Sequence, residues 1–231
     1  MKIIPVIDLM HGHVVHARNG RREQYRPIHS PLCRGSEPVT VVGGLLRVHP
    51  FNTFYVADLD ALMGREPQSE ALHRLALAFP DLRFWVDRGW PACGNGGFSW
   101  AGENFTTVIG SESLDDARLP RLTEATKPFV LSLDFRNGRL LGPISLLAQP
   151  ALWPETIIVM SLSHVGGDAG PDFERLGEFR QRHPERHCVA AGGVRDARDL
   201  ASLNDMGIAA ALMASALHSG TIDSASLVRY G

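Results

Sequence analysis

The chain has 231 residues, of which 44% are hydrophobic and 21% are charged, with a formal net charge of −2. This composition supports a folded core and excludes a disordered chain. A nucleic-acid or membrane-surface partner would require a basic face, so neither is expected. No apolar run approaches the roughly 18 residues of a membrane span. Three scattered cysteines without a Cys-x-x-Cys pair predict a cytoplasmic protein with free thiols.

Eight short apolar runs predict strands that are buried on both faces. They are residues 3–8, 53–57, 82–86, 106–109, 129–133, 156–161, 187–191 and 209–213. Helical patterns lie between them at residues 38–48, 69–78, 114–125, 143–152, 172–182, 197–206 and 224–230. The helix position after the third strand has instead a glycine-rich segment, residues 91–97. Strands that alternate with helices predict an α/β fold, either a closed barrel or a doubly wound sheet.

A repeat with an offset of 126 residues distinguishes these two folds. Asp8 and Asp134 each end an aliphatic run, and each is followed by a Gly four residues later. The ends of the second, third and fourth strands match those of the sixth, seventh and eighth. Two halves of four βα units close on each other without leaving a sheet edge. We therefore expect one (βα)8 TIM-barrel domain over residues 1–231, built from duplicated half-barrels of about 1–126 and 127–231.

Asp8 and Asp134 are the catalytic candidates. Both follow a predicted strand, and the carboxyl ends of all strands of such a barrel meet at one mouth. Two carboxyl groups that face one substrate can donate and accept a proton in turn. The alternative is that each aspartate only binds local backbone amides. Three nearby histidines lack the acidic or Cys partners of a ligand set, so neither a metal nor a cofactor is expected.

The strand ends resemble the HisA/HisF-type (βα)8 barrels of histidine biosynthesis. The matching segments, in chain order, are residues 5–9, 56–61, 108–111, 132–139, 190–194 and 216–220. The resemblance implies a site at the barrel mouth, with Asp8 and Asp134 as general acid and base. In HisA-type enzymes such a pair opens a ribose ring and moves a proton between carbons in an Amadori-type aldose–ketose isomerisation.

The resemblance also implies phosphate-binding turns after strands 3 and 4 and after strands 7 and 8, where backbone amides hold the anion. The family's first-half glycine triplet is replaced here by Asp87, Arg88 and Gly89. A carboxylate at such a turn repels phosphate unless Arg88 offsets its charge. The candidate substrate or phosphate ligands on strand ends are Gly110, Ser111, Gly192, Gly193, Ser215, Arg88, Asp58, Ser161 and His164.

The loop after the first strand is long and carries five arginines between residues 16 and 36. Guanidinium groups suit phosphate or carboxylate ligands, and loops of this length often act as lids. Arg18 and Arg21 are therefore further candidate ligands. The loop is similar to that of a divergent HisA-like branch associated with one-carbon cofactor (methanofuran or tetrahydromethanopterin) biosynthesis.

The sequence thus predicts a HisA-like acid/base enzyme acting on a phosphorylated or otherwise anionic small molecule. An Amadori-type isomerase, or a divergent paralogue with an altered substrate, fits best, and a homo-oligomer is compatible with it. Two alternatives stay open. One is a catalytically silent barrel that binds a ligand or partner, and the other is a HisF-like cyclase or lyase subunit that depends on a glutaminase.

Overall fold

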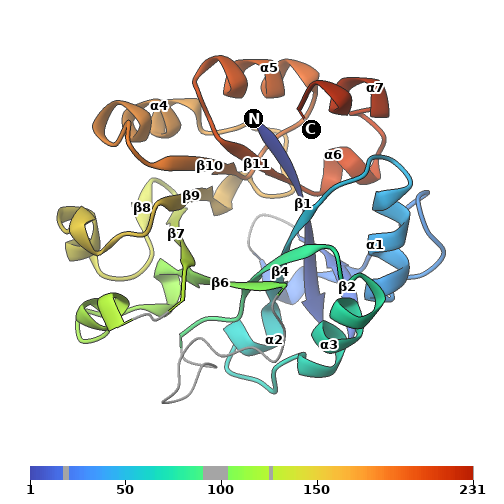
Figure 1. Cartoon of the computed structure of the whole chain (residues 1–231), viewed down its shortest axis with the longest axis horizontal. Helices are drawn as coiled ribbons and strands as arrows, with labels where there is room; N and C mark the ends of the chain where they lie inside the picture. Colours follow the sequence, from blue (N-terminus) through green and yellow to red (C-terminus); the bar gives the residue numbers. More distant parts are fainter. Residues whose placement is uncertain (18–20, 91–103, 125–126, 231) are drawn as a thin grey trace.

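A closed ring of eight parallel strands forms the centre of the molecule (Figure 1). The structure, a computed structural model, describes residues 1–17, 21–90, 104–124 and 127–230. The ring consists of β1 (Lys2–Met10), β4 (Thr53–Asp58), β5 (Arg83–Asp87), β6 (Phe105–Gly110), β7 (Phe129–Arg136), β9 (Thr156–Ser161), β10 (His187–Ala191) and β11 (Ala210–Met213). Pairing of β11 with β1 closes it. The predicted (βα)8 fold and its eight strands are confirmed.

Helices surround this ring (Figure 1). They are α1 (Pro38–Leu46), α2 (Leu59–Leu62), α3 (Ser69–Ala78), α4 (Phe173–Arg182), α5 (Ala197–Asp205), α6 (Ser215–His218) and α7 (Ser224–Leu227). Side-chain caps fix the starts of α1, α4 and α5. Glu37 accepts a hydrogen bond from the Thr40 amide at the start of α1, and Asp172 and Asp196 cap α4 and α5 in the same way. Within the described residues, no helix is long and apolar enough to cross a bilayer.

Two predicted helices are wrong. The first, residues 114–125, contains only the 3-10 segment η4 (Leu119–Glu124), and the second, residues 143–152, is divided into η5 (Ile144–Ala148) and η6 (Pro150–Leu152). Pro120 and Pro150 lack the amide hydrogen that an α-helix interior needs, which favours short turns at both places. The glycine-rich segment 91–97 lies outside the described residues.

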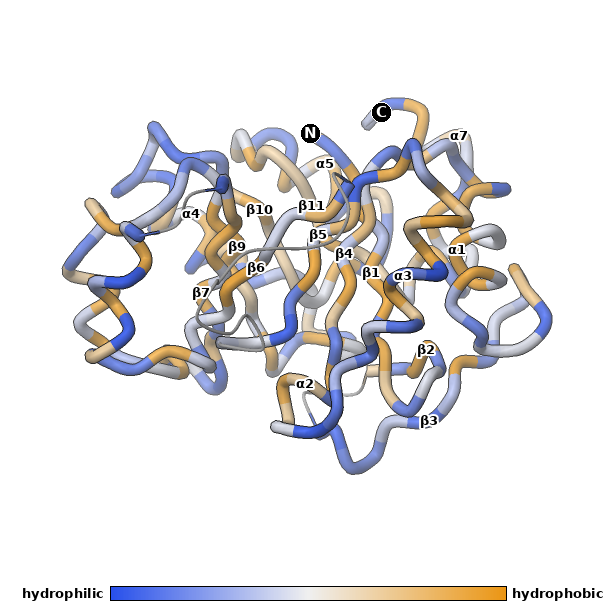
Figure 2. The backbone as a smooth tube through the Cα atoms, turned by 60° about the horizontal axis from the view of Figure 1, so that its bottom comes forward, coloured by the Kyte–Doolittle hydropathy of each residue, from blue (hydrophilic) through white to orange (hydrophobic). Residues whose placement is uncertain are grey.

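Side chains alternate along the strands between the barrel interior and the layer beneath the helices. On β1, Ile3 and Ile7 pack in the outer layer, whereas Ile4 packs in the interior. On β7, Leu131 packs outward and Val130 inward. Figure 2 shows these strands as the apolar centre of the chain, with hydrophilic residues concentrated in the peripheral loops.

This alternation fixes the direction of both candidate catalytic residues. Asp8 lies four residues after Ile4, and Asp134 lies four residues after Val130. Both side chains therefore point into the barrel at the carboxyl ends of their strands. In the order of the ring, β1 and β7 are four strands apart. The two carboxyl groups therefore enter the barrel mouth from opposite sides.

Both strands continue into a hairpin at the mouth. β1 pairs with β2 (His13–His16), and β7 pairs with β8 (Arg139–Leu140). The turn residues have positive φ in both hairpins, 52° and 79° for His11 and Gly12 and 50° and 77° for Asn137 and Gly138. This is the backbone of a tight two-residue hairpin turn, which favours Asn and Gly. It explains the repeated glycine, while the half-barrel duplication itself stays a prediction.

Candidate active site

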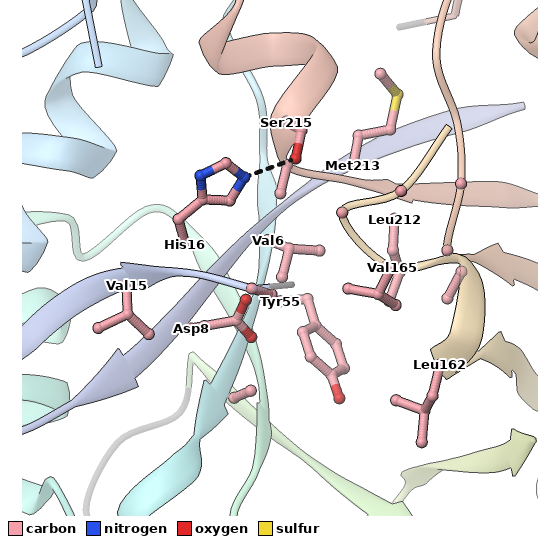
Figure 3. Close-up of a pocket in the computed structure, with 18 of the residues that line it drawn as sticks. Val6, Asp8, Val15, His16, Tyr55, Leu162, Val165, Leu212, Met213 and Ser215 are labelled. Atoms are coloured by element: carbon pink, nitrogen blue, oxygen red, sulfur yellow. Dashed lines mark hydrogen bonds between the residues drawn. The ribbon is translucent and has the colours of Figure 1, made fainter. Parts of the chain in front are cut away.

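A cavity of about 630 Å³ lies at the carboxyl ends of the strands and is lined by both Asp8 and Asp134. Figure 3 shows Asp8 beside Tyr55, near the apolar side chains of Val6 and Leu212. Barrels of this fold place their ligands at this end of the strands. The cavity thus combines an apolar centre with a carboxyl group on each of two opposite strands.

Asp8 sits deep in the barrel mouth and keeps part of its surface open to the cavity. Burial raises the pKa of its carboxyl group from 3.8 to about 7, although the positive charge of Arg22 acts in the opposite direction. A group with this pKa is partly ionised near neutral pH. Asp8 is therefore suited to accept a proton from a ligand in the cavity.

Asp134 is only 4% exposed, and three groups of the protein contact its carboxyl oxygens. Ser132 Oγ donates to Oδ1 at 2.6 Å, and the Glu112 amide donates to Oδ2 at 3.2 Å. Burial, followed by repulsion from Asp87 and Glu112, raises its pKa to about 8 in spite of these hydrogen bonds. Asp134 is therefore mostly protonated near neutral pH and is suited to donate a proton.

Asp87, at the end of β5, brings a third carboxyl group to the mouth. The Tyr55 hydroxyl donates to its Oδ2 at 3.1 Å, and the Gly89 amide donates to its Oδ1 at 3.1 Å. Burial raises the pKa of Asp87 to about 6, so the group is mostly ionised at neutral pH. A glycine makes the space for this arrangement: a Cβ on Gly110 would lie 2.9 Å from Asp134 Oδ2 and 3.2 Å from Asp87 Oδ2.

Arg22 reaches into the cavity from the loop after β2, where η1 (Arg22–Gln24) begins. Its Nη2 donates to Glu112 Oε1 at 2.5 Å, which joins this loop to the end of β6 across 90 positions of sequence. Sequence reasoning selected Arg18 and Arg21 in this loop. Arg18 lies outside the described residues, and Arg21 is exposed. The loop's contact with the cavity is thus made by the neighbouring arginine.

The turn after β10, in the second half of the barrel, brings Gly192 and Gly193 to the cavity wall. Their φ angles are 98° and 86°, and a Cβ would lie 2.5 Å from the Ser161 carbonyl oxygen at the first and 2.2 Å from the Gly170 oxygen at the second. Both positions therefore require glycine. Ser215 lines the same side, and its Oγ lies 3.4 Å from His16 Nε2 (Figure 3).

The other candidate ligands lie behind this wall. Ser111 is fully buried, and its Oγ accepts a hydrogen bond from the Asp134 amide at 2.9 Å, so it positions the catalytic candidate. Arg88 contacts the buried Asp58 at 3.4 Å, and Asp58 also caps α2. The remaining two bond to the loop after β9: Ser161 Oγ to Asp172 at 3.1 Å, and His164 Nδ1 to the Gly170 oxygen at 2.7 Å. Their role as ligands stays a prediction.

The described part of the chain contains no group of three His, Cys, Asp or Glu side chains arranged to hold a metal ion. The three histidines of the first hairpin each contact a different residue. His11 contacts Asp60, His13 contacts Ser36, and His16 contacts Ser215.

Comparison with known proteins finds similarity to proteins of histidine biosynthesis. A family model described as "Histidine biosynthesis protein" matches residues 150–223. An uncharacterized protein of Methanocaldococcus jannaschii is 27% identical in an alignment of 235 positions that covers 96% of each chain. Two relatives are named 1-(5-phosphoribosyl)-5-((5-phosphoribosylamino)methylideneamino)imidazole-4-carboxamide isomerase. The one from Thermococcus kodakarensis is 26% identical and the one from Alkalilimnicola ehrlichii 28% identical, and each match covers 96% of this chain and 94% of the relative.

Proposed function

We propose that the chain is a divergent member of the HisA-like family of (βα)8 barrels, and that it is an isomerase that uses Asp8 and Asp134 as a proton-transfer pair. The substrate would be a phosphorylated aminoaldose, and the reaction an Amadori-type conversion to the aminoketose. One observation carries the proposal: the two carboxyl groups line one cavity from opposite strands of the ring. Their raised pKa values support it, since acid/base catalysis works best with groups that titrate near the operating pH.

In this proposal Asp134 is the acid and Asp8 the base, because the pKa of Asp134 is raised further. Protonated Asp134 donates to the ring oxygen of the aminoaldose, and the ring opens to an iminium ion. Ionised Asp8 then removes the proton from C2, which gives an enaminol. The cycle closes when Asp8 returns a proton to C1 and the C2 hydroxyl gives its proton back to Asp134. Atoms and charge balance, because the product is an isomer of the substrate.

The turn at Gly192 and Gly193, together with Ser215, would hold the substrate phosphate. Both glycines line the cavity, and their positive φ angles bring backbone close to its wall. Backbone amides in such turns are common phosphate ligands. The long arginine-bearing loop further supports a substrate that differs from that of the named isomerases, and we include in the proposal a cytoplasmic role in one-carbon cofactor synthesis.

The test uses two aminoaldoses in D2O, each followed by NMR. The first is the bis-phosphoribosyl compound in the relatives' name, and the second is an N-aryl 5-phosphoribosylamine, which carries a single phosphate. We expect aminoketose formation from at least one of them, with deuterium at C1 in the fraction of turnovers in which the Asp8 proton exchanges with solvent before it is returned. Asp8→Asn and Asp134→Asn should each lower the rate by ~10²–10⁴-fold, the usual contribution of an acid or base.

The matched control is Asp81→Asn, because Asp81 is exposed and lies away from the cavity lining. It should keep full activity, and circular dichroism should show all three variants folded. A double variant of Asp8 and Asp134 that still turns over either compound at the wild-type rate would disprove the proposed pair.

A further inference from the structure

We propose that the first-half side of the cavity, around Asp87 and Glu112, selects a substrate with a positively charged nitrogen group at the end opposite its phosphate. The substrate class is then an aminoaldose monophosphate with an amine or amidine on its other end, instead of a compound with two phosphates. The inference deepens the proposed function and takes from it only that the anion binds at the Gly192–Gly193 turn.

This wall of the cavity carries negative charge. Asp87 is only 4% exposed and lines the cavity together with Glu112 and Asp134. The backbone and Tyr55 hydrogen bonds hold Asp87 in place, so its carboxylate cannot easily turn away. A phosphate here would lie against the carboxylates of Asp87 and Glu112, and like charges at such short range repel strongly in a poorly solvated site. The wall is therefore unfavourable for a second phosphate.

A cation of the protein already contacts this wall. The Arg22 guanidinium donates to Glu112 at 2.5 Å, and it interacts electrostatically with both Asp8 and Asp87. Its side chain is 22% exposed and belongs to a surface loop, whereas Asp8 and Asp87 lie on barrel strands and Glu112 lies in the 3-10 turn that follows β6. A planar, charged nitrogen group from the protein itself thus shows what this side of the cavity binds. A substrate amine or amidine would compete with Arg22 for Glu112.

The two ends of the cavity offer different chemical groups to a ligand. The second-half end offers Gly192, Gly193 and the hydroxyl of Ser215, and the first-half end offers carboxylates. The same cavity is lined by the apolar side chains of Val6, Leu162, Val165 and Leu212 (Figure 3). A ligand that fits this lining has an anionic group, a cationic group and apolar surface. The named isomerase relatives, by contrast, act on a compound with two phosphoribosyl groups.

The experiment measures binding, so it does not depend on turnover. Calorimetry compares ω-aminoalkyl phosphates of four to ten carbons with alkanediol bisphosphates of the same lengths, using the full chain at pH 7. The two probe series differ only in the group at one end. We expect the best aminoalkyl phosphate to bind at least tenfold more tightly than the matching bisphosphate. Equal or tighter binding of the bisphosphate would overturn the proposal.

Variants of the wall test its cause. Glu112→Gln, alone or together with Asp87→Asn, should reduce the preference for the aminoalkyl phosphate over the bisphosphate to about twofold or less. Glu112→Gln alone should disturb the fold least, because Glu112 is partly exposed. Arg22→Gln should tighten binding of the aminoalkyl phosphate several-fold by removing the internal competitor, while Arg22→Lys should leave it nearly unchanged. A tenfold loss of bisphosphate binding in Arg22→Gln would instead identify Arg22 as a phosphate ligand and contradict the inference. If Asp8 and Asp134 prove dispensable for turnover, the proposed function fails and the binding preference still stands on its own measurement.

Discussion

The buried carboxyl group of Asp134 should destabilise the folded protein as the pH rises, and Asp134→Asn should remove this effect. The folded pKa is about 8 and the ordinary value is 3.8, so the folded state keeps a proton that the unfolded chain releases between these values. A group with a raised folded pKa weakens folding progressively as the pH rises through this window. The asparagine variant has no such group, so it should gain stability relative to the wild type from pH 5 to pH 8.

The structure sets the magnitude. Three pH units at ~1.36 kcal/mol per unit give a ceiling of ~4 kcal/mol for the change in the stability difference between pH 5 and pH 8. Repulsion from Asp87 supplies part of the shift, and Asp87 itself becomes protonated below about pH 6. We therefore expect ~2 kcal/mol, which for a chain of this size corresponds to ~4–8 °C in the melting temperature.

The assay is urea unfolding and thermal unfolding of wild type, Asp134→Asn and the exposed control Asp81→Asn at pH 5, 6.5 and 8. The stability difference between Asp134→Asn and wild type should grow steadily with pH, and that of the control should stay constant. A difference for Asp134→Asn that is constant or shrinks with pH would refute the reasoning, because it would mean that Asp134 is ionised in the folded state.

Two further predictions concern the residues around the cavity. In urea unfolding, Gly193→Ala should lower the free energy of unfolding by at least ~2 kcal/mol more than Gly64→Ala. Both glycines have positive φ, but only at Gly193 would the added Cβ lie 2.2 Å from a backbone oxygen. Equal losses in the two variants would contradict this close contact. Ser132→Ala should raise the pKa of Asp134 by ~1 unit, since a hydrogen bond to the charged form is lost, whereas Glu112→Gln should lower it by removing a negative charge. Carbon-13 carboxyl titration reads both shifts, and shifts of the same sign would be inconsistent with this electrostatic account.

The barrel could be predicted from the sequence because each of its strands is buried on both faces. A parallel strand inside a helical layer becomes a continuous apolar run, and all eight such runs are strands in the structure. The helix predictions at 114–125 and 143–152 were wrong because both segments have helical spacing of apolar residues but contain a proline, Pro120 or Pro150, that disfavours an α-helix. Helical periodicity does not distinguish an α-helix from short 3-10 turns that bury the same leucines.

The site could be predicted only in part. Asp8 and Asp134 stand out because the same hairpin turn follows each of them, and the structure brings both to one cavity. The sequence offered Arg88 as a group that could offset Asp87. In the structure Arg88 contacts Asp58, and Arg22 from a distant loop also acts on Asp87 by its positive charge. Which loop arginine reaches the mouth depends on the path of the loop, which no local pattern encodes. The inward position of Asp87, two residues after Trp85, was available from strand alternation.

The most direct test of the account is a carbon-13 NMR titration of the Asp8 and Asp134 carboxyl groups in the free protein, with assignments from Asp8→Asn and Asp134→Asn. The account predicts midpoints near pH 7 for Asp8 and near pH 8 for Asp134, so that an ionised and a protonated carboxyl group coexist at neutral pH. If both groups titrate near pH 4, both are ionised at neutral pH, no acid is available opposite the base, and the proposed proton-transfer pair is contradicted.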